Sequence, residues 1–205
     1  MDERFRSSYE NWDKLARDIR KEQIDSMIYQ DTYDYVLSLL RPSPPARVLE
    51  LACGQGFIAQ YFLDNRPELD YLATNTSESS LSEAVQLIKG IKTDILDYAD
   101  LDKLSSTYDL ILHGVGISQI PEGQLMSFFA KTYALLNANG YLYIKLNQGL
   151  DESDDSSRNN SLNRREEELN AAYAGAGFKL DRLFTISEKE IKCRDKDTLI
   201  YILKK

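Results

Sequence analysis

Apolar residues recur along the chain with two different periods, and the change between them separates an N-terminal part from the rest. Residues 9–41 carry apolar side chains at helical spacing, for example at Trp12, Leu15 and Ile19, which predicts two or three short helices. Residues 41–45, RPSPP, cannot continue a helix, because proline lacks the amide donor and restricts the residue before it. We therefore expect an N-terminal helical cap over residues 1–41 and a stiff connector after it.

Beyond the connector, short apolar runs alternate with segments of helical spacing. Strands are predicted at 46–51, 69–75, 91–95, 108–113 and 141–146, and helices at 56–65, 77–89 and 123–136. Ser77 is placed to cap the second of these helices, and the turn NANG at 137–140 is expected to follow the third. Strands that alternate with helices imply right-handed crossovers, so the pattern predicts an α/β fold with a doubly wound parallel sheet.

The C-terminal third of the chain follows a different pattern. Residues 147–163 are polar and turn-forming, which predicts a surface loop. Residues 164–176 are predicted as a helix that ends at Gly177, and 178–188 and 197–205 as two strands. No helix-length pattern separates these strands, so they should pair antiparallel. With 205 residues, the chain fits one domain made of the cap, a core at 46–146, the loop, and a C-terminal unit at 164–205.

Composition narrows the classes of partner. The formal charge of −8 disfavours a polyanion, and the dense basic cluster at 158–165 is interleaved with Asn and Glu, so nucleic acid is not the expected substrate. No apolar run reaches the ~20 residues of a membrane span, and the N-terminus is charged where a secretory signal would be apolar, which predicts a cytoplasmic protein. Cys53 and Cys193 lack metal-site spacing, so we expect two reduced thiols and no metal.

The strand at 46–51 leads into a glycine turn, within VLELACGQGF at 48–57. Glu50 stands near the strand end, followed by the small residues Ala52 and Cys53 and then by Gly54 and Gly56. Glycines between a strand and a helix permit an unusual backbone, and close approach to a ligand is the favoured reason for them here. Taken alone, this turn fits many nucleotide-binding folds.

Four later segments narrow that choice, because together with the turn they resemble the motifs of class I S-adenosylmethionine (SAM) dependent methyltransferases. Ala52 stands at the first glycine of motif I. Residues 75–84 follow the family pattern Asp-x-Ser-x-x-x-Leu-x-x-Ala with Asn75 at its head, and 93–95 stand where the family holds adenine. Residues 108–112 resemble the strand-four motif, and 135–142 the turn before strand five. The resemblance implies a seven-stranded sheet of order 3-2-1-4-5-7-6 with the last strand antiparallel, and SAM as cofactor.

A nicotinamide-binding dehydrogenase is the competing interpretation of the glycine turn, since Ala59 supplies the third small residue of that motif. Such a protein would normally continue with a further parallel unit and not with a C-terminal strand pair. The strand pair therefore favours the methyltransferase type.

The resemblance also implies a cofactor site. Its residues are Glu50, Ala52, Gly54, Gly56, Asn75, Thr76, Asp94, Ile95 and His113. Glu50 would orient the glycine loop and help to receive the SAM ammonium, or cap loop amides. Asp94 would accept from the adenine amino group while Ile95 packs on the base. Asn75 replaces the acidic residue that accepts from both ribose hydroxyls, and the loss of a charge-assisted bond predicts binding weaker by about 1 kcal/mol.

His113 is the only histidine, and it ends the strand at 108–113 on the ligand-bearing edge of the sheet. It could serve as general base, or simply line the site near the methionine part of SAM. Ser118 and Gln119 occupy the place where many relatives carry two histidines. Four aromatic residues of the cap could roof the acceptor site or belong to the core: Tyr9, Trp12, Tyr29 and Tyr33.

These observations predict a SAM-dependent methyltransferase that acts on N or O of a small molecule or peptide. The acceptor site is expected from the cap and from the loops at 113–121 and 145–163. A non-catalytic or regulatory SAM-fold binding protein is the alternative, motivated by Asn75 and by the absence of the two histidines. The sequence does not specify the acceptor, the methylated atom or the oligomeric state.

Overall fold

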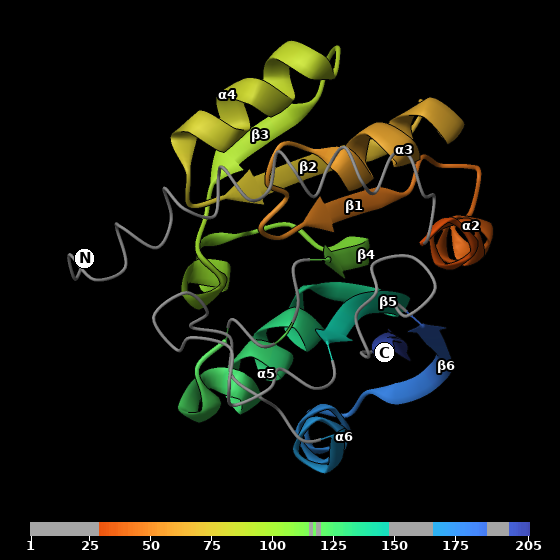
Figure 1. The fold of residues 1–205 in the computed structure, drawn as a ribbon, viewed down its shortest axis with the longest axis vertical. Helices are drawn as coiled ribbons and strands as arrows, with labels where there is room; N and C mark the ends of the chain where they lie inside the picture. Colours follow the sequence, from red (N-terminus) through yellow and green to blue (C-terminus); the bar gives the residue numbers. More distant parts are fainter. Residues whose placement is uncertain (1–28, 115–116, 118–119, 148–165, 188–196) are drawn as a thin grey trace.

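A computed structural model describes residues 29–114, 117, 120–147, 166–187 and 197–205 of the chain (Figure 1). In chain order, the elements are α2 (Gln30–Leu39), β1 (Arg47–Glu50), α3 (Phe57–Asn65), β2 (Asp70–Asn75), α4 (Glu78–Leu87), β3 (Lys92–Ile95), the 3-10 helix η1 (Tyr98–Lys103), β4 (Tyr108–His113), the 3-10 helix η3 (Glu122–Gln124), α5 (Leu125–Leu135), β5 (Leu136–Asn147), α6 (Glu166–Gly175), β6 (Lys179–Ser187) and β7 (Asp197–Lys204).

All seven strands form one sheet, in the order β3-β2-β1-β4-β5-β7-β6. The strands β1 to β5 run parallel, whereas β7 is antiparallel to both of its neighbours, β5 and β6. The α/β class, the strand order and the antiparallel last strand are therefore confirmed.

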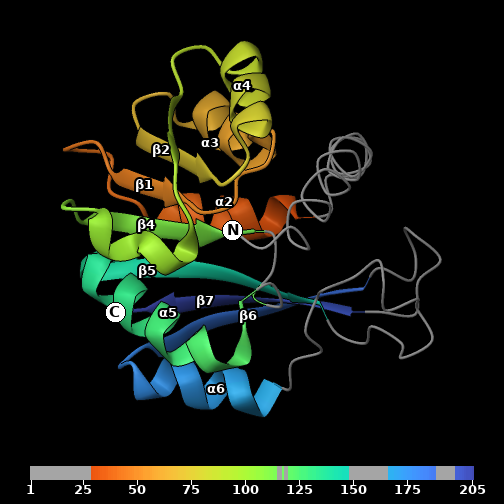
Figure 2. The same cartoon turned by 90° about the vertical axis from the view of Figure 1, so that its left-hand side faces the viewer.

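Helices cover both faces of the sheet, as the two ribbon views show (Figure 2). One apolar cluster joins α2 and α3 to one face, where Val48 and Leu110 point, and a second joins α5 and α6 to the opposite face, where Leu49 and Ile111 point. Successive residues of the central strands are buried on alternate sides, as expected for a parallel sheet covered on both faces. This explains why the strands are continuous apolar runs in the sequence.

The C-terminal end of α5 differs from the expectation. The helix stops at Leu135 and β5 begins at once with Leu136, so residues 137–140 lie within the strand and not in a separate turn. Tyr108 pairs with Leu136, but Leu110 already pairs with Tyr141, and Asn139 has a positive φ of 63° in the extra length. The polar NANG segment is thus an irregularity of the β4–β5 pairing, which sequence pattern cannot distinguish from a turn.

The predicted helix at 77–89 and its cap can also be compared with the structure. The Ser77 side chain accepts from the backbone amide of Ser80, which confirms the predicted cap, although the helix ends at Leu87. The 3-10 helix at Tyr98–Lys103 was not expected. The predicted cap helices before residue 29 and the polar loop at 148–163 lie outside the described residues, and α2 is the part of the cap that is described.

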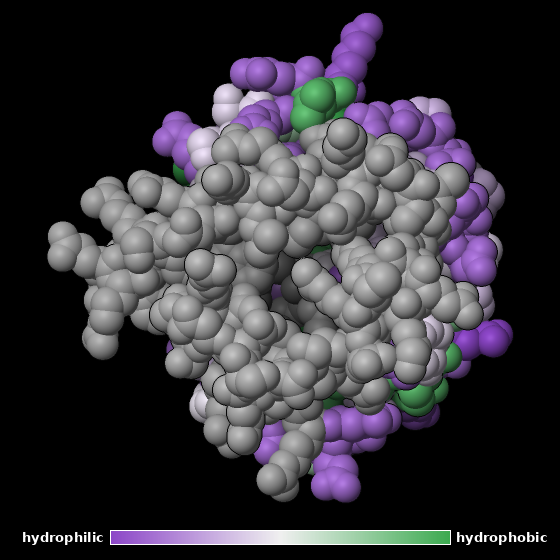
Figure 3. All heavy atoms as spheres, in the orientation of Figure 1, coloured by the Kyte–Doolittle hydropathy of each residue, from purple (hydrophilic) through white to green (hydrophobic). Residues whose placement is uncertain are grey.

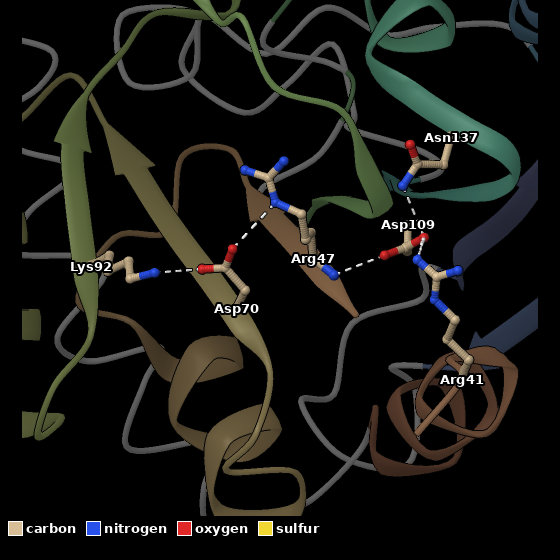
Figure 4. A network of polar contacts seen from close by, with 6 residues as sticks. All are labelled: Arg41, Arg47, Asp70, Lys92, Asp109 and Asn137. Atoms are coloured by element: carbon tan, nitrogen blue, oxygen red, sulfur yellow. Dashed lines mark hydrogen bonds and ion pairs between the residues drawn. The ribbon is translucent and has the colours of Figure 1, made fainter. Parts of the chain in front are cut away.

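A polar network ties the amino ends of five neighbouring strands together (Figure 4). Asp109 of β4 accepts from the backbone amide of Arg47 at 2.9 Å and from the Asn137 amide at 2.9 Å. On the other side, Asp70 of β2 accepts from Arg47 at 3.2 Å and from Lys92 at 2.5 Å. The network lies at the sheet edge opposite to the glycine loop, so it stabilises the scaffold and leaves the carboxyl edge open.

No helix in the described part of the chain is long and apolar enough to cross a membrane.

Candidate functional site

The loop from Leu51 to Gly56 joins β1 to α3 at the carboxyl edge of the sheet. Three of its residues have left-handed backbone: Ala52 with φ 53°, Gly54 with φ 55° and Gly56 with φ 77°. The amide of Leu51 donates to the carbonyl of Leu112 in β4 at 2.8 Å, and the amide of Cys53 to the carbonyl of Thr74 in β2 at 2.9 Å. The loop is therefore held between the strands on either side of β1, close to the point where the order of the parallel strands reverses.

The two glycines are needed for different reasons. At Gly56, a Cβ atom would lie 2.6 Å from Cδ1 of Ile88 and 3.2 Å from Cβ of Ala84, so this glycine allows α4 to pack against the start of α3. At Gly54, a Cβ would meet no atom of the described residues within 4 Å. Close helix packing thus explains Gly56 without a ligand, whereas Gly54 has open space beside its backbone.

Ala52 also departs from what its residue type predicts. In the sequence it is a small residue at a glycine position, but its backbone is left-handed, a conformation that costs a residue with a Cβ roughly 1–2 kcal/mol. The loop imposes this conformation because the residues on either side of Ala52, Leu51 and Cys53, are bonded to neighbouring strands.

Glu50 is buried at the end of β1, with 2% of its surface exposed. Its Oε2 accepts from the hydroxyl of Tyr71 in β2 at 2.8 Å. Burial raises the pKa of this carboxyl to about 8, an effect only partly opposed by the Tyr71 hydroxyl and the backbone of Ala59. Tyr71 was not identified from the sequence, because its position in β2 is that of an ordinary core aromatic.

Asn75 ends β2, and its side-chain oxygen already accepts hydrogen bonds from the protein backbone. Its Oδ1 accepts from the backbone amides of Thr76 at 2.7 Å and Ser77 at 3.3 Å. The side-chain acceptor therefore supports the turn into α4, and the Nδ2 donor is the part of the amide left for a ligand. Thr76 lies beside it, half-buried.

β3 brings Asp94 and Ile95 to the same edge. Asn75 is in register with Ile95 and Thr74 with Asp94, while the amide of Leu96 donates to the Asn75 carbonyl at 3.1 Å. Asp94 is exposed, and Ile95 is 58% exposed, which is unusual for an apolar residue at a strand end. The structure thus brings three of the predicted site residues together on the ends of two adjacent strands.

His113 ends β4 on the other side of the glycine loop and is buried, with 2% exposure. Its ring packs against Phe128 of α5 with 5.5 Å between ring centroids, and neither ring nitrogen has a hydrogen-bond partner among the described residues. Burial lowers its pKa to about 4, so the imidazole is neutral at pH 7.

Other predicted positions are core or lie outside the description. Tyr29 and Tyr33 are buried, and Tyr33 packs among other rings, including those of Phe62 and Tyr143, so both belong to the core. Tyr9, Trp12, Ser118 and Gln119 lie outside the described residues. Within the described ranges, no group of three or more His, Cys, Asp or Glu side chains is arranged to hold a metal.

Comparison with known proteins agrees with this arrangement. Residues 48–140 match a family model described as a methyltransferase domain. No curated protein matches the chain. The fold is similar to that of an S-adenosylmethionine-dependent methyltransferase from Clostridium acetobutylicum, with 15% identity, coverage of 94% of this chain and 98% of that one, and a TM-score of 0.70.

Two further structures show the same fold. Magnesium protoporphyrin IX methyltransferase from Synechocystis PCC 6803, solved with bound SAM, is 16% identical, covers 87% of this chain and 80% of its own, and has a TM-score of 0.65. A cyclopropane synthase from Mycobacterium tuberculosis is 13% identical, with 85% and 83% coverage and a TM-score of 0.67. At these identities the likeness establishes the fold and not a shared substrate.

Proposed function

Because residues 48–140 match a methyltransferase-domain family model and the chain has the fold of SAM-dependent methyltransferases, we propose that the protein transfers the methyl group of SAM to N or O of a small molecule or peptide. The observation that carries the proposal is the left-handed glycine loop, which is bonded to β2 and β4 and has open space beside Gly54. Ligands of doubly wound sheets bind at this edge, where the strand order reverses.

The cofactor site in this proposal follows the carboxyl edge from β3 to β4. Exposed Ile95 and Asp94 would receive adenine, Asn75 and Thr76 the ribose, and the backbone at Ala52, Gly54 and Gly56 would border the methionine part. Two features support the fit: the free side of Gly54, and an apolar side chain exposed beside Asn75. Glu50 has a positioning role in this proposal: its hydrogen bond with Tyr71 holds the end of β1 in place.

The chemistry requires little from protein side chains. When bound, SAM supplies a methyl group on an already activated sulfonium leaving group, so the protein contributes mainly by alignment and by excluding water. We assign His113 to the lining of the site, because an imidazole with a pKa of about 4 is a weak proton acceptor at neutral pH. A pH–rate profile that lost an inflection near pH 4 in His113→Gln would instead support the general-base role.

A non-catalytic SAM-fold protein is the second candidate, and Asn75 is the observation that favours it. The Asn75 acceptor is already used by the amides of Thr76 and Ser77, so its side chain offers ribose a donor in place of an anionic acceptor. Turnover against a panel of amines, hydroxyl compounds and peptides, followed as S-adenosylhomocysteine formation, separates the two candidates.

Calorimetry with SAM tests the cofactor site directly, and Asn75→Asp sharpens the test. One carboxylate oxygen can keep the amides of Thr76 and Ser77 while the other accepts from ribose, so we expect the Kd to fall by roughly fivefold to tenfold, about 1 kcal/mol or slightly more. Asn65→Asp, at the end of α3, is the matched control and should leave the Kd unchanged. Absence of SAM binding at millimolar concentration would refute the proposal, and an unchanged Kd in Asn75→Asp would refute the ribose assignment.

A further inference from the structure

Glu50 is the one fully buried carboxyl among the described residues, with 2% of its surface exposed. The other described carboxylates are at least partly exposed, and Figure 3 shows hydrophilic residues over most of the described surface in view. The hydrogen-bond partners of Glu50 in the described part of the chain are the Tyr71 hydroxyl at 2.8 Å and the backbone of Ala59. Neither partner is charged.

The described groups that face this carboxyl carry no positive charge. The titratable ones are Tyr71 of β2, Cys53 of the glycine loop and Tyr33 of α2. Burial raises the pKa of all three, so each is neutral at pH 7. On the side of β4, the residue in register with Glu50 is apolar Leu112, and no cation of the described residues acts on the carboxyl. A carboxylate buried without a counter-charge is so unfavourable that the group holds a proton instead.

The position of Glu50 in the chain relates this carboxyl to the proposed cofactor site. Glu50 ends β1 and directly precedes the glycine loop, whose backbone borders the methionine part of SAM in the proposed function. That part of SAM carries a sulfonium, an ammonium and one carboxylate, so its net charge is positive. S-adenosylhomocysteine keeps the ammonium and the carboxylate but has an uncharged thioether in place of the sulfonium. The cofactor and its product therefore differ by one positive charge next to the loop that follows Glu50.

We propose that Glu50 is a specificity-determining residue: it is neutral in the free protein, releases its proton when SAM binds, and so makes the preference for SAM over S-adenosylhomocysteine increase with pH. The inference rests on the proposed function, because it requires SAM at the glycine loop. A nearby positive charge stabilises a carboxylate, and SAM brings one more such charge than S-adenosylhomocysteine.

The direction of the pH dependence follows from linkage. A ligand that releases a proton on binding binds more tightly as pH rises, until the carboxyl is ionised without ligand as well. Burial raises the pKa of Glu50 to about 8 in the free protein, so the effect belongs to the pH range below about 8. Because SAM stabilises the carboxylate more than S-adenosylhomocysteine does, its affinity should increase more steeply over this range.

The preference is measured by calorimetry of the full chain with SAM and with S-adenosylhomocysteine at pH 6 and pH 8. We expect the ratio of the Kd for S-adenosylhomocysteine to the Kd for SAM to rise by about fivefold, within the usual range of coupling. Glu50→Gln keeps a neutral polar side chain and should lose this rise. The titration of the ligands themselves is the same for both chains and does not affect the comparison. Glu68→Gln is the matched control and should keep the rise, because Glu68 is exposed and pairs with Arg66 before β2.

Proton release provides a second measurement that needs only the wild-type chain. Binding enthalpies at pH 7 in two buffers of different ionisation enthalpy should show release of roughly half a proton or more with SAM, and less with S-adenosylhomocysteine. If SAM binds without releasing a proton, or if the ratio of the two Kd values is the same at both pH values or rises equally in Glu50→Gln, the inference is overturned and the proposed function stands. If SAM does not bind at all, the proposed function fails, and this inference fails with it.

Discussion

At the scale of single residues, the glycine loop contains two different contributions to stability, the strain of a left-handed backbone and the steric clash of an added Cβ. Ala52, Gly54 and Gly56 all have left-handed backbone, but their surroundings differ. A Cβ at Gly54 has open space, a Cβ at Gly56 would collide with Ile88, and Ala52 already carries a Cβ in this conformation. Three substitutions in one loop therefore isolate each contribution.

Ala52→Gly should raise the free energy of unfolding by about 1 kcal/mol. The strain of alanine in the left-handed conformation is larger than the additional conformational entropy that glycine loses on folding. Gly54→Ala should lower it by about the same amount, for the backbone reason alone. Gly56→Ala should lower it by at least roughly 1 kcal/mol more, because Ile88 or α4 must move. Chemical denaturation measures all three. Equal effects of the two Gly→Ala changes would contradict the packing role of Gly56.

At the scale of elements, the polar network at the amino edge holds neighbouring strands in register. Asp109 is its centre, with a side chain only 15% exposed that bonds to the Arg47 amide in β1 and to Asn137 in β5. Because a buried amide without a partner is costly, this residue should matter more than an ordinary surface carboxylate.

Asp109→Ala should lower the free energy of unfolding by roughly 1–3 kcal/mol, because the Arg47 amide and the Asn137 side chain lose their acceptor. Asp102→Ala is the control: Asp102 pairs with Lys131 at 2.7 Å but is 71% exposed, so its removal should change stability little. Urea denaturation of both variants provides the comparison. A loss in Asp102→Ala as large as that in Asp109→Ala would show that the network has no special role.

At the scale of the whole molecule, burial of Glu50 makes stability depend on pH. Its pKa is about 8 in the folded protein and near 4.5 in the unfolded chain, so the folded state holds more protons between these values. This residue therefore contributes a loss of stability as pH rises from about 4.5 to about 8, with a slope of up to about 1.4 kcal/mol per pH unit. Below about pH 4.5 the carboxyl is protonated in both states and the contribution is constant.

Glu50→Gln should remove that slope, so the difference in unfolding free energy between variant and wild type should grow in favour of the variant as pH rises from 5 to 8. Tyr71→Phe removes a bond that lowers the pKa of Glu50, and should extend the slope to higher pH. Denaturation at several pH values measures both. Parallel wild-type and Glu50→Gln curves would show that the carboxyl is ionised in the folded state.

Much of this architecture follows from local pattern. The strand periods, the Ser77 cap and the C-terminal strand pair identify a doubly wound sheet that ends in antiparallel strands, because alternation and helix ends depend on neighbouring residues. The prediction that was wrong, a turn at 137–140, also concerned local structure. A polar NANG segment is equally suited to a turn and to an irregular strand, and only its pairing with β4 distinguishes them.

For the candidate site, the sequence likewise predicts where the residues lie but not which interactions their side chains make. Its residues could be identified from their order, since the carboxyl ends of parallel strands must meet at one edge. What each side chain does there was not determined. The bond from the Tyr71 hydroxyl to Glu50, and the burial of His113 with no hydrogen-bond partner among the described residues, depend on atoms brought close by folding.

The sequence by itself therefore determined the fold class, the edge of the sheet that forms the candidate site, and the family to which the motifs point. Only the tertiary structure decided why Gly56 is a glycine, why Glu50 is held by Tyr71, and that no cation of the described residues acts on Glu50. The physical reason is range: periodicity and turn chemistry act between residues a few positions apart. Burial, packing and pKa depend on segments that meet only in the folded chain.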